Sequence, residues 1–134
     1  MKVDKLAHIG IAVSDIDSLV QVFEKKLGLK CSMRKEVQEH NVEVAVFPIG
    51  DTAIELLKPI NPDSSIKRFI DKKGPGLHHI AFEVDNIAES IQELESSGVN
   101  MIDKKPRIGA QDCPIAFIHP ESMGGILIEL EEDK

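Results

Sequence analysis

Two histidines and two glutamates stand at matching places in the two halves of the 134-residue sequence. His8 opens the segment HIGIAVSDI, and His79 opens the related segment HIAFEVDNI 71 residues later. Glu55 and Glu129 each form the middle of an Ile-Glu-Leu tripeptide, 47 residues after His8 and 50 residues after His79 respectively. Imidazole and carboxylate groups bind divalent ions such as Co²⁺, Ni²⁺, Mn²⁺ or Zn²⁺ and leave positions open for water or substrate. This pattern predicts a metal site.

The direction of these four side chains follows from the alternation of side chains along strands. In the predicted strand Leu6–Val13, His8 lies on the face opposite the isoleucines, and the predicted strand Leu77–Val84 repeats this arrangement around His79. The two glutamates alternate with apolar neighbours in the same way. All four are expected to face away from the helices and to converge. A lone histidine on a strand is more often structural, but paired polar groups on an inner face need a compensating partner, which favours a metal ion.

The repeat also predicts the fold. Apolar periodicity in each half indicates a strand, a helix and three further strands. The first module spans residues 1–60, a connector with a short helix spans 61–76, and the second module spans 77–134. The last three strands of the chain are expected near residues 100–105, 114–119 and 126–130. We therefore predict one α+β domain of two tandem βαβββ modules, whose curved mixed sheets surround a metal-binding cleft.

A further glutamate, Glu43, lies in the strand-like segment NVEVAVFP. It shares a face with Ala45 and Phe47, and we expect that face to be turned to the cleft. A carboxylate held near a metal could act as a general base toward a bound acidic carbon. The alternative is a solvated glutamate on an edge strand. The final EEDK of the chain is expected to be a solvated tail.

The composition narrows the class of partner. Acidic residues exceed basic ones by 23 to 16, and the chain has no Trp or Tyr, which argues against nucleic acid. No run approaches the roughly 20 apolar residues of a membrane span. Cys31 and Cys113 form no metal-binding or disulfide pattern. With no evident signal peptide, we expect a cytoplasmic protein, or the mature form of an organelle protein, that binds a small molecule.

The paired βαβββ pattern with His, Glu, His and Glu resembles the vicinal oxygen chelate superfamily, and within it the methylmalonyl-CoA epimerases. The segments that carry the likeness are LAHIGIAVSDID, FPIGDTAIELLKP, GPGLHHIAFEVDNI and HPESMGGILIEL. The resemblance implies that His8, Glu55, His79 and Glu129 ligate a divalent metal, and that Glu43 and Glu129 act as opposing acid/base groups. It implies epimerisation of an acyl-CoA substrate, methylmalonyl-CoA, by a 1,1-proton transfer through a metal-stabilised enolate. It also implies a homodimer.

One loop departs from the resemblance. Family members often carry a Gly-Gly and a basic residue where this chain has Gln111 to Pro114, although Arg107 and Gly109 do fit. The departure leaves the handling of the CoA moiety without assigned residues. Two alternatives therefore stay open: a glyoxalase I-type lactoylglutathione lyase with the same ligand set, and a non-catalytic binding or resistance module of the same fold. The second is disfavoured because it has no need of all four ligands.

Overall fold

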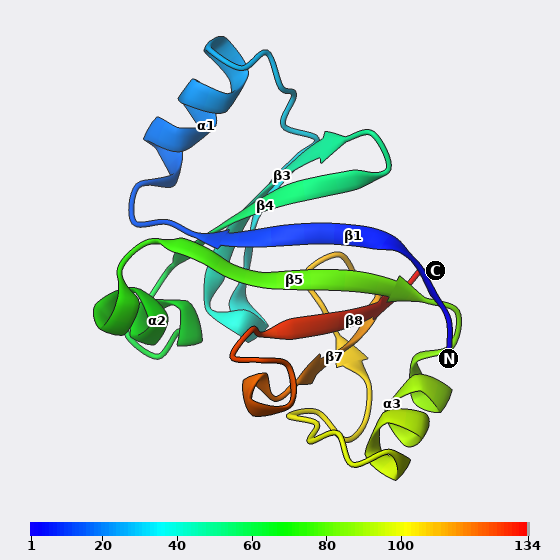
Figure 1. Cartoon of the computed structure of the whole chain (residues 1–134). Coiled ribbons are helices and arrows are strands. Elements are labelled where there is room, and N and C mark those ends of the chain that lie inside the picture. Colours follow the sequence, from blue (N-terminus) through cyan, green and yellow to red (C-terminus); the bar gives the residue numbers. More distant parts are fainter. Residues whose placement is uncertain (134) are drawn as a thin grey trace. The chain divides into compact units, whose positions relative to one another are not determined.

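The computed structural model describes residues 1–133 and shows the order of elements expected for two βαβββ modules (Figure 1). In chain order the elements are β1 (Val3–Ala12), α1 (Ile16–Lys25), β2 (Met33–Val37), β3 (Val42–Ile49), β4 (Thr52–Pro59), α2 (Ser65–Lys73), β5 (Gly76–Val84), α3 (Ile87–Ser96), β6 (Arg107–Ile108), β7 (Pro114–Ile118) and β8 (Ile128–Glu132). Short 3-10 turns lie at Gln38–His40 and Pro120–Ser122. Parallel and antiparallel pairs both occur, so the predicted α+β class with mixed sheets is confirmed.

The chain divides into two compact units. One comprises Ile9–His78, and the other comprises Met1–His8 together with the residues from His79 onward. The strand β1 contributes to both units. The module boundaries predicted at residues 60 and 76 follow the sequence repeat and stay a prediction. None of the helices in residues 1–133 is both long enough and apolar enough to span a membrane.

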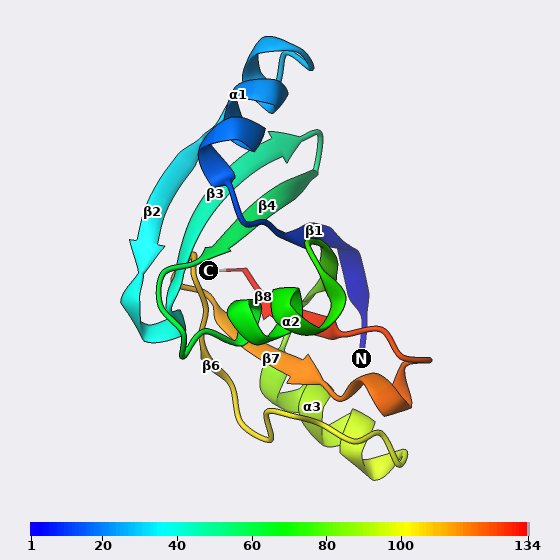
Figure 2. The same cartoon turned by 90° about the vertical axis from the view of Figure 1, so that its left-hand side faces the viewer.

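In the unit Ile9–His78 the strand order is β2, β3, β4 and then the end of β1. Antiparallel β2, β3 and β4 lie side by side (Figure 2), and β1 runs parallel to β4. Asp15 caps the N-terminus of helix α1, where its Oδ1 accepts a 3.1 Å hydrogen bond from the Ser18 amide. Its apolar stripe packs on one face of the strands, and the buried core there consists of Val13, Ile16, Val20, Ala45, Phe47 and Leu56.

Phe47 is the largest fully buried side chain of this core. It is 0% exposed, and its ring meets Phe23 edge-on with 5.1 Å between centroids. We expect Phe47→Ala to lower the free energy of unfolding by about 3–5 kcal/mol, because the cavity adds to the lost transfer energy. Urea titration followed by circular dichroism measures this. A loss below about 1 kcal/mol would mean that the core under α1 is less tightly packed than described.

In the other unit the start of β1 is followed by β5, β8, β7 and β6. β8 runs parallel to β5 and antiparallel to β7, and Figure 1 shows β5 and β8 alongside each other. α3 packs against β7 and β8. The buried core consists of Val84, Ile87, Ile91, Met101, Ala116, Ile118, Ile128 and Leu130. Each module therefore has its own apolar core under its own helix.

Two predicted segments of this unit were wrong. Residues 100–105 do not form a strand: Met101 makes only an isolated bridge to Ile118, and the Asp103 side chain accepts a 2.8 Å hydrogen bond from the Phe117 amide. A side-chain acceptor thus replaces part of the backbone ladder. The beginning of the terminal EEDK is not a solvated tail, because Glu131 and Glu132 belong to β8. Glu132 accepts a 2.8 Å hydrogen bond from the Ile87 amide at the start of α3.

Candidate metal centre

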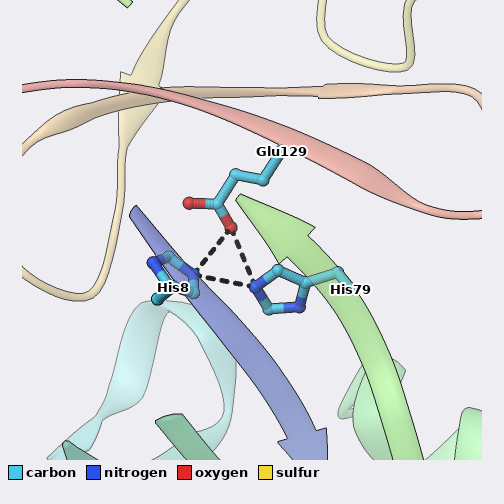
Figure 3. A group of neighbouring side chains, drawn as sticks. All are labelled: His8, His79 and Glu129. Atoms are coloured by element: carbon cyan, nitrogen blue, oxygen red, sulfur yellow. Dashed lines mark hydrogen bonds and ion pairs between the residues drawn. The ribbon is translucent and has the colours of Figure 1, made fainter. Parts of the chain in front are cut away.

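Three of the predicted ligands meet within one unit: His8 from β1, His79 from β5 and Glu129 from β8 (Figure 3). The two Nε2 atoms of the histidines lie 2.9 Å apart. Glu129 Oε1 lies 3.2 Å from His79 Nε2 and 3.7 Å from His8 Nε2. The three residues are only 3%, 6% and 5% exposed, respectively for His8, His79 and Glu129. The structure therefore gathers one donor atom from each of three separate strands in a buried place.

Strand register explains why Glu129 reaches this place. Ile128 and Leu130 belong to the core under α3, so the alternating residue Glu129 points to the opposite face. The parallel pairing of β8 with β5 sets Glu129 opposite Ala81, two residues after His79 and on the same face of β5. Ala81 is 0% exposed, and its small side chain leaves the space over the strand to the larger polar groups.

The two imidazoles stabilise the ionised form of the Glu129 carboxyl. Burial raises the pKa of the Glu129 carboxyl, but hydrogen bonds to His79 and His8 outweigh it and lower the pKa to about 2. The carboxylate is therefore ionised at neutral pH, inside a site almost closed to water. A buried negative charge of this kind is stable only with a compensating partner.

The donor set and its spacing fit a divalent cation. Two donors bound at about 2.1 Å to one ion lie about 3.0–3.4 Å apart in tetrahedral or octahedral geometry. The three atoms here are 2.9, 3.2 and 3.7 Å apart. Two imidazole nitrogens and a carboxylate oxygen suit the first-row ions Co²⁺, Ni²⁺, Mn²⁺ and Zn²⁺. The residues present would hold such an ion with little rearrangement.

The fourth predicted ligand, Glu55, belongs to the unit Ile9–His78. It lies on β4 opposite Gly10 of β1, and it is only 3% exposed. Its neighbours Ile54 and Leu56 pack in the core under α1, so Glu55 points to the face away from that helix, as expected from alternation. Its role as a fourth ligand stays a prediction.

The structure corrects the expected direction of Glu43. Ala45 and Phe47, which share its face of β3, lie in the core under α1. Glu43 therefore points to the α1 side, where its carboxylate accepts a 2.7 Å hydrogen bond from Arg34 Nε, and the Arg34 guanidinium also pairs with Asp17 of α1. Both hydrogen bonds raise the pKa of Arg34, and the one to Asp17 contributes more than the one to Glu43.

Glu43 and Glu55 consequently lie on opposite faces of the same sheet. Val46 is the residue of β3 that pairs with Glu55, and Glu43 is three positions away from it, on the other face. The expectation that Glu43 shares the cleft face with Glu55 is therefore wrong. We therefore do not assign Glu43 as the general base.

Sequence reasoning missed Glu131. It follows Glu129 by two residues on β8, is 9% exposed, and places Oε1 at 3.5 Å from His8 Nδ1. The signal was present, because residues two apart on a strand share a face. Because Glu131 begins the charged segment EEDK, the sequence suggests that it is exposed to solvent.

The loop around Gln111 to Pro114, whose sequence differs from the family pattern, forms a tight turn. The Gly109 amide donates to the Cys113 carbonyl at 2.9 Å, and the Asp112 amide donates to the Gly109 carbonyl at 3.1 Å. Asp112 takes a left-handed conformation, with φ 60°. A Cβ at Gly109 would come within 2.8 Å of the Ile115 side chain, so a larger residue here would have to displace Ile115.

The family is decided by comparison with known proteins. The family model of the glyoxalase/bleomycin resistance protein/dioxygenase superfamily matches residues 7–117. The chain belongs to this superfamily. Among its relatives, the uncharacterized protein YqjC of Bacillus subtilis is 43% identical over 98% of this chain and 94% of that protein. The mitochondrial methylmalonyl-CoA epimerase of Mus musculus is 36% identical over 98% of this chain and 74% of the relative.

Solved structures of the superfamily agree with this placement. Methylmalonyl-CoA epimerase from Mycobacterium tuberculosis is 32% identical, with a TM-score of 0.93 over 98% of this chain and 89% of that one. A methylmalonyl-CoA epimerase in complex with methylmalonyl-CoA and NH4+ is 29% identical, with a TM-score of 0.94 over 98% of this chain and 96% of that chain. Lactoylglutathione lyase of Escherichia coli O157:H7 is more distant, at 26% identity over 97% of this chain and 93% of the lyase. This member of the superfamily is thus a methylmalonyl-CoA epimerase-like enzyme, an isomerase.

Proposed function

We propose that this chain interconverts the R and S epimers of methylmalonyl-CoA by a 1,1-proton transfer. The observation that carries the proposal is the buried group of His8, His79 and Glu129, a donor set suited to a divalent cation. Full-length similarity to epimerases supports the substrate, as does the related structure that holds methylmalonyl-CoA. The homodimer and the cytoplasmic location stay predictions from the sequence.

We assign His8, His79 and Glu129 as metal ligands, with Glu55 as the predicted fourth. The native metal is one of Co²⁺, Ni²⁺, Mn²⁺ and Zn²⁺ on the chemistry of these donors. A divalent cation, when bound, supplies Lewis acidity that makes the carbon beside a thioester carbonyl easier to deprotonate. The histidines would contribute their Nε2 donors, and the low exposure of the three residues limits the access of water to a bound ion.

Glu129 is the acid/base group that we assign to one face of the reacting carbon, and inversion of the configuration requires a second group that protonates the opposite face. Its carboxylate is ionised and 5% exposed, so it can accept a proton from a carbon acid brought into the site. The same two imidazoles that lower its pKa share its pocket. When their Nε2 atoms serve as ligands, they would no longer donate to Glu129, and the cation that Glu129 also binds would keep its carboxylate ionised.

The proposal is tested by following the conversion of one pure epimer of methylmalonyl-CoA with a mutase that accepts only the other. The metal-stripped chain and the Co²⁺-reloaded chain are compared. We expect reloading to restore turnover by at least about a hundredfold. A lactoylglutathione lyase activity, with no epimerisation under the same loading, would replace this function by the alternative that shares the ligand set.

Substitution of Glu43 tests whether this residue is the general base. We expect Glu43→Gln to change turnover by less than about threefold, because the residue faces α1 and contacts Arg34. Loss of a partly exposed ion pair costs at most about 1 kcal/mol of stability. The epimerase assay and a thermal melt measure both effects. A fall in kcat of about a hundredfold with metal content unchanged would return Glu43 to the role of general base.

A further inference from the structure

Glu131 is a second buried carboxylate beside the metal centre that the proposed chemistry does not use. It lies on β8, two residues beyond Glu129, with its side chain 12% exposed. Leu130 between them packs into the core under α3, so both glutamates point to the face that carries the histidines. The position of Glu131 is therefore fixed by the same strand that positions a predicted ligand.

The imidazole of His8 lies between these two carboxylates. Its Nε2 is 3.7 Å from Glu129 Oε1, and its Nδ1 is 3.5 Å from Glu131 Oε1. The His8 side chain is only 4% exposed, so water has little access to compete for either nitrogen. The distance to Glu131 is at the outer limit of a hydrogen bond, and a small rotation of either side chain would close it.

This arrangement has a consequence for the tautomer of His8. A neutral imidazole carries its proton on one nitrogen and offers a lone pair on the other. A carboxylate beside Nδ1 favours the proton there when a cation takes the Nε2 lone pair, in place of the Nε2 proton that otherwise faces Glu129. Ligating histidines in metal sites commonly have such a carboxylate on the nitrogen that does not bind the metal.

We infer that Glu131 is a positioning residue of the metal centre, which holds His8 in the Nδ1-protonated tautomer and fixes its ring so that Nε2 is presented to the cation. The inference rests on the proposed function, because it takes the site to be a metal centre. The role of Glu131 itself is inferred from the contact between its carboxylate and His8 Nδ1. Glu131 itself is not a ligand in this assignment, because its oxygen faces Nδ1 rather than the Nε2 atoms.

The test uses the full chain, stripped of metal, and three variants. Glu131→Leu removes the acceptor, Glu131→Gln keeps an acceptor oxygen without the charge, and Glu83→Gln is the matched control. Glu83 pairs with Glu131 in register on β5, and its carboxylate lies 3.9 Å from Lys5. Calorimetric titration with Co²⁺ gives the affinity, and ¹⁵N NMR of the histidine side chains gives the tautomer of His8. Circular dichroism shows which variants fold.

We expect Glu131→Leu to weaken Co²⁺ binding by about 10–100-fold and to reduce the Nδ1-protonated population of His8. Glu131→Gln should recover part of both, and Glu83→Gln should match the wild type. If Glu131→Leu does not fold, the Co²⁺ affinity and the His8 tautomer of Glu131→Gln are compared with those of Glu83→Gln to test the inference. Wild-type affinity and tautomer in a folded Glu131 variant would overturn the inference.

These readouts are independent of turnover, so the two proposals can fail separately. A chain that binds Co²⁺ and shows the Glu131 effect, but does not epimerise methylmalonyl-CoA, supports the inference and removes the proposed function. A wild-type chain that binds no Co²⁺ overturns the inference together with the ligand set. An active, metal-dependent chain with no Glu131 effect removes the inference alone.

Discussion

Replacing His79 by alanine is expected to lower the affinity for Co²⁺ by more than about a hundredfold, beyond the 10–100-fold typical of residues that only support a ligand. His79 Nε2 is the central donor of the group, 2.9 Å from His8 Nε2 and 3.2 Å from Glu129 Oε1. Without it, two donors remain in the cluster and Glu129 loses a hydrogen bond. Calorimetric titration of the stripped variant measures the change, and turnover should fall with metal content.

His119→Ala is the control for this experiment. His119 lies in the same unit and caps a 3-10 turn, where its Nδ1 accepts a 3.1 Å hydrogen bond from the Glu121 amide. The control removes one histidine without touching the cluster, and it should bind Co²⁺ as the wild type does. Stoichiometric, tight binding by the His79 variant would contradict the assignment of the ligands.

Glu129→Gln is expected to lower kcat by about 10²–10⁴-fold, the usual contribution of a general acid or base. Glutamine keeps the size of the side chain and one oxygen that can face the histidines, so the fold should persist. It cannot accept and return a proton. Metal affinity should also fall, because the ionised carboxylate is the one negative donor among the three grouped residues.

The two effects of Glu129→Gln are separated by assaying at saturating Co²⁺, where a ligand-only role would let turnover recover. Persistent loss of kcat at full metal occupancy supports a role in proton transfer. Recovery to within about threefold of the wild type would mean that Glu129 is a ligand and that another group moves the proton. Glu83→Gln again supplies the matched loss of one charge on a neighbouring strand.

Strand alternation was sufficient to predict the group of His8, His79 and Glu129. Residues on the opposite faces of their strands, among them Ile11, Ile80 and Leu130, pack under a helix, which sets the direction of all three side chains. The direction of Glu43 could not be obtained in this way. On β3 the residues of both faces are buried, among them Val44 and Ala45, so the pattern does not say which face the helix covers.

Other errors have a similar origin in contacts between distant residues. The strand expected at residues 100–105 failed because Asp103 bonds the Phe117 amide, 14 residues later in the chain. The charged neighbours of Glu131 at the chain end suggest a solvated tail. Its place in the structure depends on β5, its register neighbour, and on the distant His8.

The most direct test of the central claim is exchange of the α-proton of methylmalonyl-CoA with solvent deuterium. The Co²⁺-loaded chain is incubated with the substrate in D₂O and followed by ¹H NMR, beside the metal-stripped chain and Glu129→Gln. We predict rapid loss of the α-proton signal with the loaded wild type, and exchange slower by at least about a hundredfold with the other two. A loaded chain that leaves the α-proton in place, with the metal shown to be bound, would contradict carbon-acid chemistry on this substrate.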